Sequence, residues 1–198
     1  MRAGVLALQG GVVEHLHMLK KAAEKLSINV ELIEVRSKSD LEQVDVLVIP
    51  GGESTAIYRL SKRLGLIEPL KEKILEGTPT LGTCAGAAAL AKQVVDAQSH
   101  KEYEPILGVM DVKVIRNYFG RQRESFEADL NINGIGQFRG IFIRAPVIEP
   151  LSSSVEVLAK FKDVTVAARQ GNVIATSFHP ELTSDTRIHQ MLFEMVKK

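Results

Sequence analysis

Short apolar runs alternate with helical patterns along the first half of the chain. The runs are rich in β-branched residues and predict strands at residues 4–8, 28–33, 44–49 and 79–81. Apolar residues recur at helical spacing over residues 12–26, 54–64 and 66–76, whereas residues 40–42 suggest only a short turn. Strands that are apolar almost throughout and alternate with helices indicate a parallel sheet with helices on both faces.

The pattern changes after about residue 110, where strands follow one another with little helix between them. They are predicted at residues 112–115, 126–130, 140–143, 155–161, 164–168 and 173–177. The Gln170-Gly171-Asn172 turn is typical of a hairpin, so some of these strands should pair antiparallel. A last helical stripe covers residues 184–198, with Ser184 and Asp185 as candidate caps. The expected fold is therefore an α/β three-layer sandwich, with a mostly parallel central sheet and some antiparallel strands in the C-terminal half.

Length and charge limit the classes of protein that this chain can represent. Its 198 residues contain no linker-like stretch, so we expect one domain over residues 1–198. The 25 Lys and Arg against 24 Asp and Glu give no basic field for nucleic acid. No apolar stretch approaches the ~20 residues that span a bilayer, and the first one is too short for a secretory signal. We expect a soluble, cytoplasmic protein with neither a nucleic-acid nor a membrane partner.

The single cysteine, Cys84, excludes an internal disulfide, and without Cys or His partners at ligand spacing we expect no metal site. A lone cysteine is most often a small buried hydrophobe, so its neighbours decide its role. The segment Gly82-Thr83-Cys84-Ala85-Gly86 leads from a strand into an Ala-rich helix and matches a nucleophile elbow. A Cβ at either glycine would clash in so tight a turn, and the helix N-terminus favours the thiolate. The context therefore predicts that Cys84 is a nucleophile.

A cysteine nucleophile that attacks an acyl group needs a histidine and a group that orients the histidine. We interpret four of the five histidines as packing or solvent-exposed residues: His15, His17, His100 and His189. His179 differs because it ends a predicted strand and is followed by Pro180-Glu181. Residues two apart in an extended segment point to the same side, so Glu181 can reach the ring of His179. The alternative is that His-Pro-Glu is only a strand end.

An oxyanion site needs backbone donors beside the nucleophile. The third predicted strand ends in Pro50-Gly51-Gly52-Glu53-Ser54, at the same edge of a parallel sheet as Cys84. We expect Gly51, Gly52 and the amide of Ala85 to form the site. The alternative for the two glycines is a plain turn; the loop lacks the Gly-Lys of a Walker A motif, and Gln9-Gly10-Gly11 is not a dinucleotide-binding motif.

These three motifs together resemble the class I, triad-type glutamine amidotransferases. Several further segments are similar to the glutaminase subunits of pyridoxal 5′-phosphate synthases, from near residue 4 to near residue 187. They are Gly4-Val5-Leu6-Ala7-Leu8-Gln9-Gly10, Arg116-Asn117-Tyr118-Phe119-Gly120-Arg121-Gln122, Ser125-Phe126-Glu127-Ala128-Asp129-Leu130, Phe142-Ile143-Arg144-Ala145-Pro146 and Ser177-Phe178-His179-Pro180-Glu181-Leu182-Thr183.

The resemblance implies Cys84 as the nucleophile, His179 as the acid and base, and Glu181 as its orienting partner. It also implies that Gln9 lies close to the oxyanion loop and helps to set its orientation. L-glutamine would be hydrolysed through a γ-glutamyl thioester without a cofactor. The residues implied to hold the glutamine are Gly52, Glu53, Ser54, Arg116, Ile143 and Arg144.

The resemblance further implies a partner, a separate synthase (lyase) subunit that receives the ammonia directly within a large hetero-oligomer. Activity would stay low until that subunit docks and orders the oxyanion loop. Two alternatives remain: a glutaminase subunit that serves another synthase, and a non-catalytic regulatory module on the same fold. The segments 116–122 and 142–146 argue against the first, and the intact set of Cys84, His179 and Glu181 argues against the second.

Overall fold

The computed structural model describes residues 1–120 and 122–196 of the chain. Arg121, in the loop segment 116–122, and residues 197–198, at the end of the last predicted helix, lie outside the described residues. Within the described part, no helix is long and apolar enough to cross a membrane.

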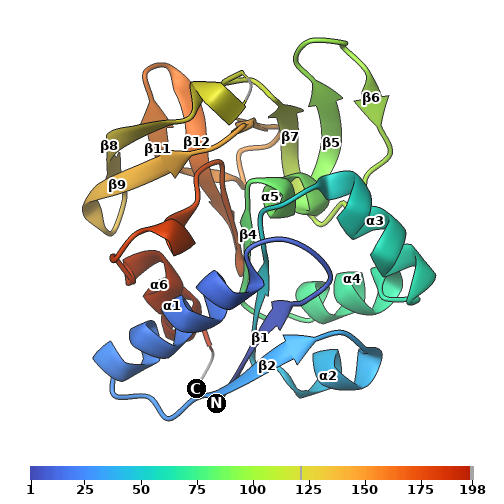
Figure 1. Cartoon of the computed structure of the whole chain (residues 1–198), viewed down its shortest axis with the longest axis vertical. Coiled ribbons are helices and arrows are strands. Elements are labelled where there is room, and N and C mark those ends of the chain that lie inside the picture. The colour runs from blue at the N-terminus through green and yellow to red at the C-terminus, as the bar shows by residue number, and fades with distance from the viewer. Residues whose placement is uncertain (121, 197–198) are drawn as a thin grey trace.

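A seven-stranded sheet forms the centre of the molecule, in the order β11-β12-β13-β4-β3-β1-β2 (Figure 1). Neighbours from β13 to β2 pair parallel, whereas β11-β12 and β12-β13 pair antiparallel, the latter across the turn at Gly171. The mostly parallel sheet with antiparallel strands at its C-terminal edge confirms the predicted fold class. The strands are β1 (Arg2–Leu6), β2 (Glu31–Val35), β3 (Val46–Ile49), β4 (Thr80–Thr83), β11 (Glu156–Phe161), β12 (Val164–Gln170) and β13 (Val173–Thr176).

Helices cover both faces of this sheet because its central strands are apolar on both sides. On β3, Val46 and Val48 pack into the core shared with α1 and α6, whereas Leu47 and Ile49 pack into the core shared with α3 and α4. Figure 1 shows the two groups of helices on opposite sides of the sheet. The helices are α1 (Val12–Lys25), α2 (Lys38–Gln43), α3 (Ser54–Arg63), α4 (Ile67–Leu75), α5 (Ala85–Leu90) and α6 (Arg187–Glu194).

Three of the predicted strands belong outside the central sheet. The strand predicted at residues 112–115 lies in a second sheet, of order β10-β7-β5-β6, and those at 126–130 and 140–143 form a separate hairpin. Sequence patterning missed β5, β6 and β10, because β5 alternates irregularly between buried and exposed positions and β6 has only two residues. The strands are β5 (Ala91–Asp96), β6 (Glu102–Tyr103), β7 (Met110–Arg116), β8 (Phe126–Ile132), β9 (Gly136–Phe142) and β10 (Val147–Pro150), and two 3₁₀ turns are η1 (Gln122–Glu124) and η2 (Pro180–Leu182).

Two helix boundaries also differ from the sequence expectation. The expected turn at residues 40–42 is the helix α2, whose start is stabilised by reciprocal hydrogen bonds between Ser37 and Asp40. The last helix begins at Arg187, and its N-cap residue Thr186 makes no capping hydrogen bond with its side chain. Asp185 accepts the Arg187 N–H at 3.0 Å, so this candidate cap acts one position before the N-cap.

Candidate active site

Three neighbouring strands of the central sheet deliver the predicted site residues to one edge. The Gly51-Gly52 loop follows β3, Cys84 follows β4, and His179 comes three residues after β13. Because β3, β4 and β13 are adjacent and parallel, their carboxyl ends meet there. The fold thus brings together segments that are far apart in the sequence.

Cys84 occupies a sharp strand-to-helix turn with φ 49° and ψ −102°, a conformation that L-residues rarely adopt. Glycine is required on both sides of Cys84 because a side chain at either position would collide with backbone atoms. A Cβ on Gly82 would lie 2.7 Å from the Gly86 oxygen, and one on Gly86 would lie 2.0 Å from the Ile49 oxygen. The predicted tight elbow is confirmed, and it holds the thiol, in a residue that is 9% exposed, at the sheet edge.

His179 and Glu181 are in contact, with 2.7 Å between Nδ1 and Oε1. The contact is made differently from the sequence expectation, because β13 ends at Thr176 and Pro180–Leu182 is a 3₁₀ turn rather than extended chain. The Glu181 side chain is only 2% exposed. A buried carboxylate therefore contacts the imidazole at Nδ1.

The electrostatics of this pair favour a charged imidazole. Burial of His179 lowers its pKa, but hydrogen bonds to Cys84 and Glu181, together with their negative charges, outweigh burial and raise the pKa to about 10. The Cys84 Sγ also lies 3.9 Å from the Ile143 carbonyl oxygen. The site thus holds a charged imidazole beside the Cys84 sulfur, and a neighbouring cation is a feature of reactive cysteines in general.

The oxyanion loop corrects one expectation. The Gly51 N–H donates to Thr83 Oγ1 at 2.8 Å, and the Gly51 oxygen accepts the Gly11 N–H at 3.2 Å. The Gly51 amide is therefore engaged within the fold and is not free to bind an oxyanion. A side chain is also excluded at Gly51, because its Cβ would lie 2.6 Å from Cε1 of His179.

Gln9 lies against the oxyanion loop, as expected. Its side-chain oxygen accepts the Glu53 N–H at 2.6 Å, and a Cβ on Gly52 would lie 2.2 Å from that oxygen. Only a glycine at position 52 leaves room for this contact.

A pocket of about 200 Å³ opens in front of Cys84 and His179. It brings together all six predicted glutamine-binding residues: Gly52, Glu53, Ser54, Arg116, Ile143 and Arg144. Ala85 also lines the pocket, whereas Gly51, Gln9 and Glu181 do not. Four further lining residues were not predicted from the sequence. Asn117, Gln122 and Pro146 lie in the segments 116–122 and 142–146 that carry the family resemblance, whereas Ala88 lies in α5.

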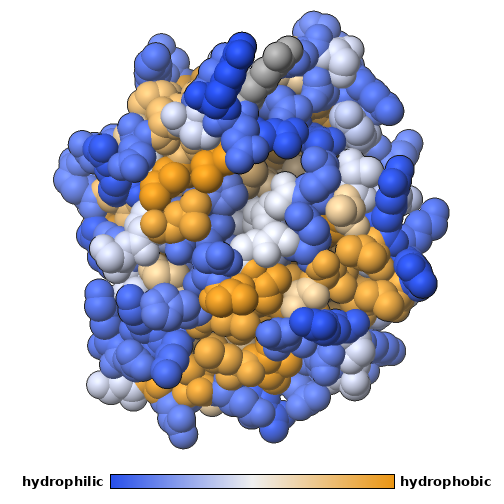
Figure 2. Space-filling view, viewed as in Figure 1, coloured by the Kyte–Doolittle hydropathy of each residue, from blue (hydrophilic) through white to orange (hydrophobic). Residues whose placement is uncertain are grey.

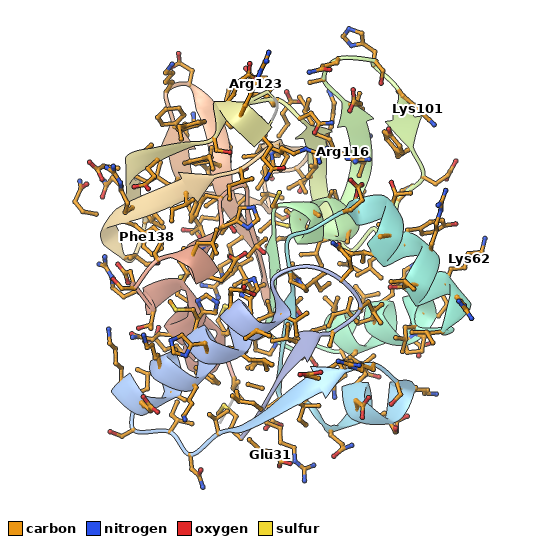
Figure 3. All side chains as sticks on the ribbon, viewed as in Figure 1. Glu31, Lys62, Lys101, Arg116, Arg123 and Phe138 are labelled. Atoms are coloured by element: carbon orange, nitrogen blue, oxygen red, sulfur yellow. The ribbon has the colours of Figure 1, made fainter. Side chains whose placement is uncertain are left out.

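Opposite charges meet at one side of this pocket. Arg116 Nη2 lies 3.1 Å from Glu53 Oε1, and the guanidinium stacks 4.8 Å from the centre of the Tyr103 ring. Figure 3 shows Arg116 at the end of β7, above α5. This pair offers a cationic and an anionic partner to a zwitterionic ligand.

Two histidines that the sequence assigned only to packing or solvent lie behind the site. His15 and His189 are fully buried, as the packing interpretation allows, but His15 also approaches Glu181. Helical spacing could not reveal this contact, because it shows only which residues face the core. His17 and His100 are exposed. Within residues 1–120 and 122–196, no three His, Cys, Asp or Glu side chains gather as a metal site requires.

The fold and the site place the chain among the glutamine amidotransferases. A crystal structure of a glutamine amidotransferase superposes with a TM-score of 0.83 at 46% identity and covers 98% of both chains. PurLQS from Thermotoga maritima, at 16% identity and a TM-score of 0.64, covers 98% of this chain and 96% of that one and shares the fold.

The chain belongs to the SNO glutamine amidotransferase family, whose model matches residues 5–198. A protein of Ignicoccus hospitalis is 65% identical over 97% of this chain and 98% of its own length. A protein of Aeropyrum pernix is 51% identical over the whole of both chains. Both relatives are named pyridoxal 5′-phosphate synthase subunit PdxT, which confirms the resemblance found in the sequence.

Proposed function

We propose that this protein hydrolyses L-glutamine to L-glutamate and ammonia, and that it supplies the ammonia to a separate pyridoxal 5′-phosphate synthase subunit. One observation carries the first part: a single pocket holds Cys84, His179 and the charged pair Arg116–Glu53. The names of the relatives support the second part. A glutaminase serving another synthase and a non-catalytic module are both less consistent with this combination.

Glutamine binds with its side-chain amide toward Cys84. In this proposal Arg116 attracts the α-carboxylate and Glu53 attracts the α-ammonium, so the ligand separates a pair that otherwise bonds to itself at 3.1 Å. Ser54, Ile143 and Arg144 complete the walls around the ligand. Positioning the amide carbon beside the sulfur makes the attack effectively unimolecular.

The first chemical step forms a thioester. The Cys84 thiolate bonds to the amide carbon, and the carbonyl electron pair moves to oxygen, where the Gly52 and Ala85 N–H groups would receive the negative charge. When the carbonyl re-forms, the C–N bond breaks, and the His179 imidazolium gives its proton to the departing nitrogen, releasing ammonia. A γ-glutamyl thioester and a neutral His179 remain.

The second step restores the enzyme. Neutral His179 takes a proton from a water molecule as the water oxygen attacks the thioester carbon. Collapse of this intermediate breaks the C–S bond and returns the thiolate beside the imidazolium. The product is glutamate, whose new γ-carboxylic acid ionises in solution. Glu181 holds the imidazole in the orientation that both proton transfers need.

The ammonia has to reach its acceptor before it protonates in bulk water. We infer that residues 1–198 form one glutaminase domain that works in the cytoplasm within a large hetero-oligomer, passing ammonia directly to the synthase subunit. Exposed apolar side chains lie beside the site, with Val13 at 72% and Leu182 at 44% exposure. Figure 2 shows apolar residues gathered over the start of α1. Such a surface favours contact with another chain.

Glutamate release, measured with and without the synthase subunit, tests both parts of this proposal. We expect low activity from the protein alone, a marked increase when the subunit is added, and none from Cys84→Ala in either case. Loss of the thiol leaves no nucleophile, so the reduction should exceed about 10⁴-fold.

The possible outcomes separate the two parts. An absence of glutamate with the partner present would refute the glutaminase assignment. Equal activity with and without the partner would refute activation by docking while leaving the hydrolysis intact.

A further inference from the structure

A buried polar cluster lies directly behind the triad, on the side away from the pocket. It joins His15 of α1, His189 of α6, Thr83 at the end of β4 and Glu181 of η2. The first three residues are fully buried, and Glu181 is 6% exposed. Burying polar groups costs free energy, so packing alone does not explain why four elements each contribute a polar side chain to this cluster.

His15 lies close to Glu181, the partner of His179, and to Thr83, which contacts the oxyanion loop. His15 Nε2 lies 3.4 Å from Glu181 Oε2, while the other carboxylate oxygen of Glu181 contacts His179 at 2.7 Å. The same Nε2 lies 3.2 Å from Thr83 Oγ1, which accepts the Gly51 N–H of the oxyanion loop. His15 therefore connects to His179 through Glu181, and to the oxyanion loop through Thr83.

The protonation of the cluster follows from the groups that face His15. Burial, reinforced by His189 and His179, holds the pKa of His15 well below its usual value, so its imidazole is neutral and carries one N–H. Within the described residues, Glu181 Oε2 has no hydrogen bond of good geometry, and a carboxylate oxygen buried without a donor is expensive. A single N–H on Nε2 makes the hydrogen bond to Thr83 Oγ1 and lies beside this carboxylate oxygen, with 3.4 Å between Nε2 and Oε2.

His189 completes the assignment. His15 Nδ1 lies 2.9 Å from His189 Nε2, so an unprotonated Nδ1 accepts the N–H of His189. Burial lowers the pKa of His189 to about 3, which keeps this ring neutral as well. His189 Nδ1 then carries no proton, which agrees with the lack of any partner for this atom in the described part of the chain. His189 thus sets the tautomer of His15.

We propose that His15 is a positioning residue for the reaction: its polar contact with the second carboxylate oxygen of Glu181 keeps the first oxygen aligned with His179. The inference rests on the proposed function for its catalytic consequence. A carboxylate bonded on one side only can rotate about its last torsion, whereas one contacted on both sides keeps a fixed plane. Fixing this plane fixes the imidazole that moves both protons.

Two variants of similar size separate this role from simple packing. The amide nitrogen of Gln replaces Nε2 of histidine, whereas that of Asn replaces Nδ1. His15→Gln therefore keeps a donor for Glu181 and loses the contact with His189, and His15→Asn does the reverse. His17→Gln is the matched control, because His17 is exposed on the same helix.

We expect His15→Asn to lower kcat for glutamine hydrolysis, measured with the synthase subunit present, by about 10-fold or more. KM should change by less than about 2-fold, because His15 does not line the glutamine pocket. His15→Gln should keep kcat within about 3-fold of wild type, and His17→Gln should leave it unchanged. A KM change without a kcat change, or a folded His15→Gln as impaired as His15→Asn, would overturn the proposal.

Alkylation of the single cysteine by iodoacetamide provides a readout that does not depend on glutamine. A poorly held Glu181 stabilises the imidazolium less, so the thiolate fraction at pH 7 and the alkylation rate should fall several-fold in His15→Asn but not in His15→Gln. Wild-type rates in both variants, with unchanged kcat, would refute the positioning role. If wild type hydrolyses no glutamine but His15→Asn still alkylates slowly, the proposed function fails while the positioning role stands.

Discussion

At the scale of single residues, Gln9 connects the first strand to the oxyanion loop. Its side-chain oxygen accepts the Glu53 N–H at 2.6 Å and lies against Gly52, which fixes the peptide between these two residues. Gln9→Ala should release that peptide and lower glutaminase activity by about 10-fold or more, since an oxyanion donor acts only when it is preorganised. The measurement is the rate of glutamate release with the synthase subunit present.

A matched control is Gln43→Ala, which removes the same side chain from the exposed surface of α2. We expect this variant to retain full activity. Full activity in Gln9→Ala as well would show that the loop holds its orientation without Gln9.

At the scale of elements, the elbow between β4 and α5 depends on two glycines. A Cβ on Gly86 would lie 2.0 Å from the Ile49 oxygen, a backbone atom that cannot move without displacing β3. Gly86→Ala should therefore lower the free energy of unfolding by about 3 kcal/mol or more. The comparison is Gly134→Ala, where φ is +80° but nothing lies within 4 Å, so only backbone strain of about 1–2 kcal/mol is expected.

Urea unfolding of both variants measures this difference. Equal destabilisation would show that the elbow relaxes around a methyl group at position 86.

Some elements and contacts of this fold could be predicted from the sequence, and others could not. The central parallel strands, such as β3 and β13, were predictable because they are buried on both faces, and the elbow and the His-Pro-Glu segment were predictable because each is a local spacing. In the second sheet β7 was predicted, whereas β6 was missed because it has only two residues and β5 because it lacks regular alternation. The contacts of His15 were beyond reach because its partners Thr83 and His189 lie 68 and 174 positions away. Only the packing of α1 against α6 and β4 brings them together.

At the scale of the whole molecule, the three site histidines impose opposite pH dependences on folding. The pKa of His179 is raised to about 10, so the folded chain keeps a proton that the unfolded chain releases above about pH 6.5. Stability from this group is complete below that pH and is lost as the pH rises toward 10. His15 and His189 act in reverse, because their lowered pKa values make the unfolded chain the better proton acceptor below about pH 6.5.

These signs predict a maximum of stability near neutral pH, measurable as the free energy of unfolding in urea between pH 4 and pH 10. His179→Gln should flatten the alkaline side, where one such group contributes up to about 1.4 kcal/mol per pH unit. His189→Gln should make the acid side less steep, with the contribution of His15 remaining, and leave the alkaline side unchanged. If both variants kept the wild-type profile, the pH dependence would have to arise from carboxylates and lysines elsewhere. The raised pKa of His179, on which the proposed mechanism depends, would then be contradicted by the unfolding data.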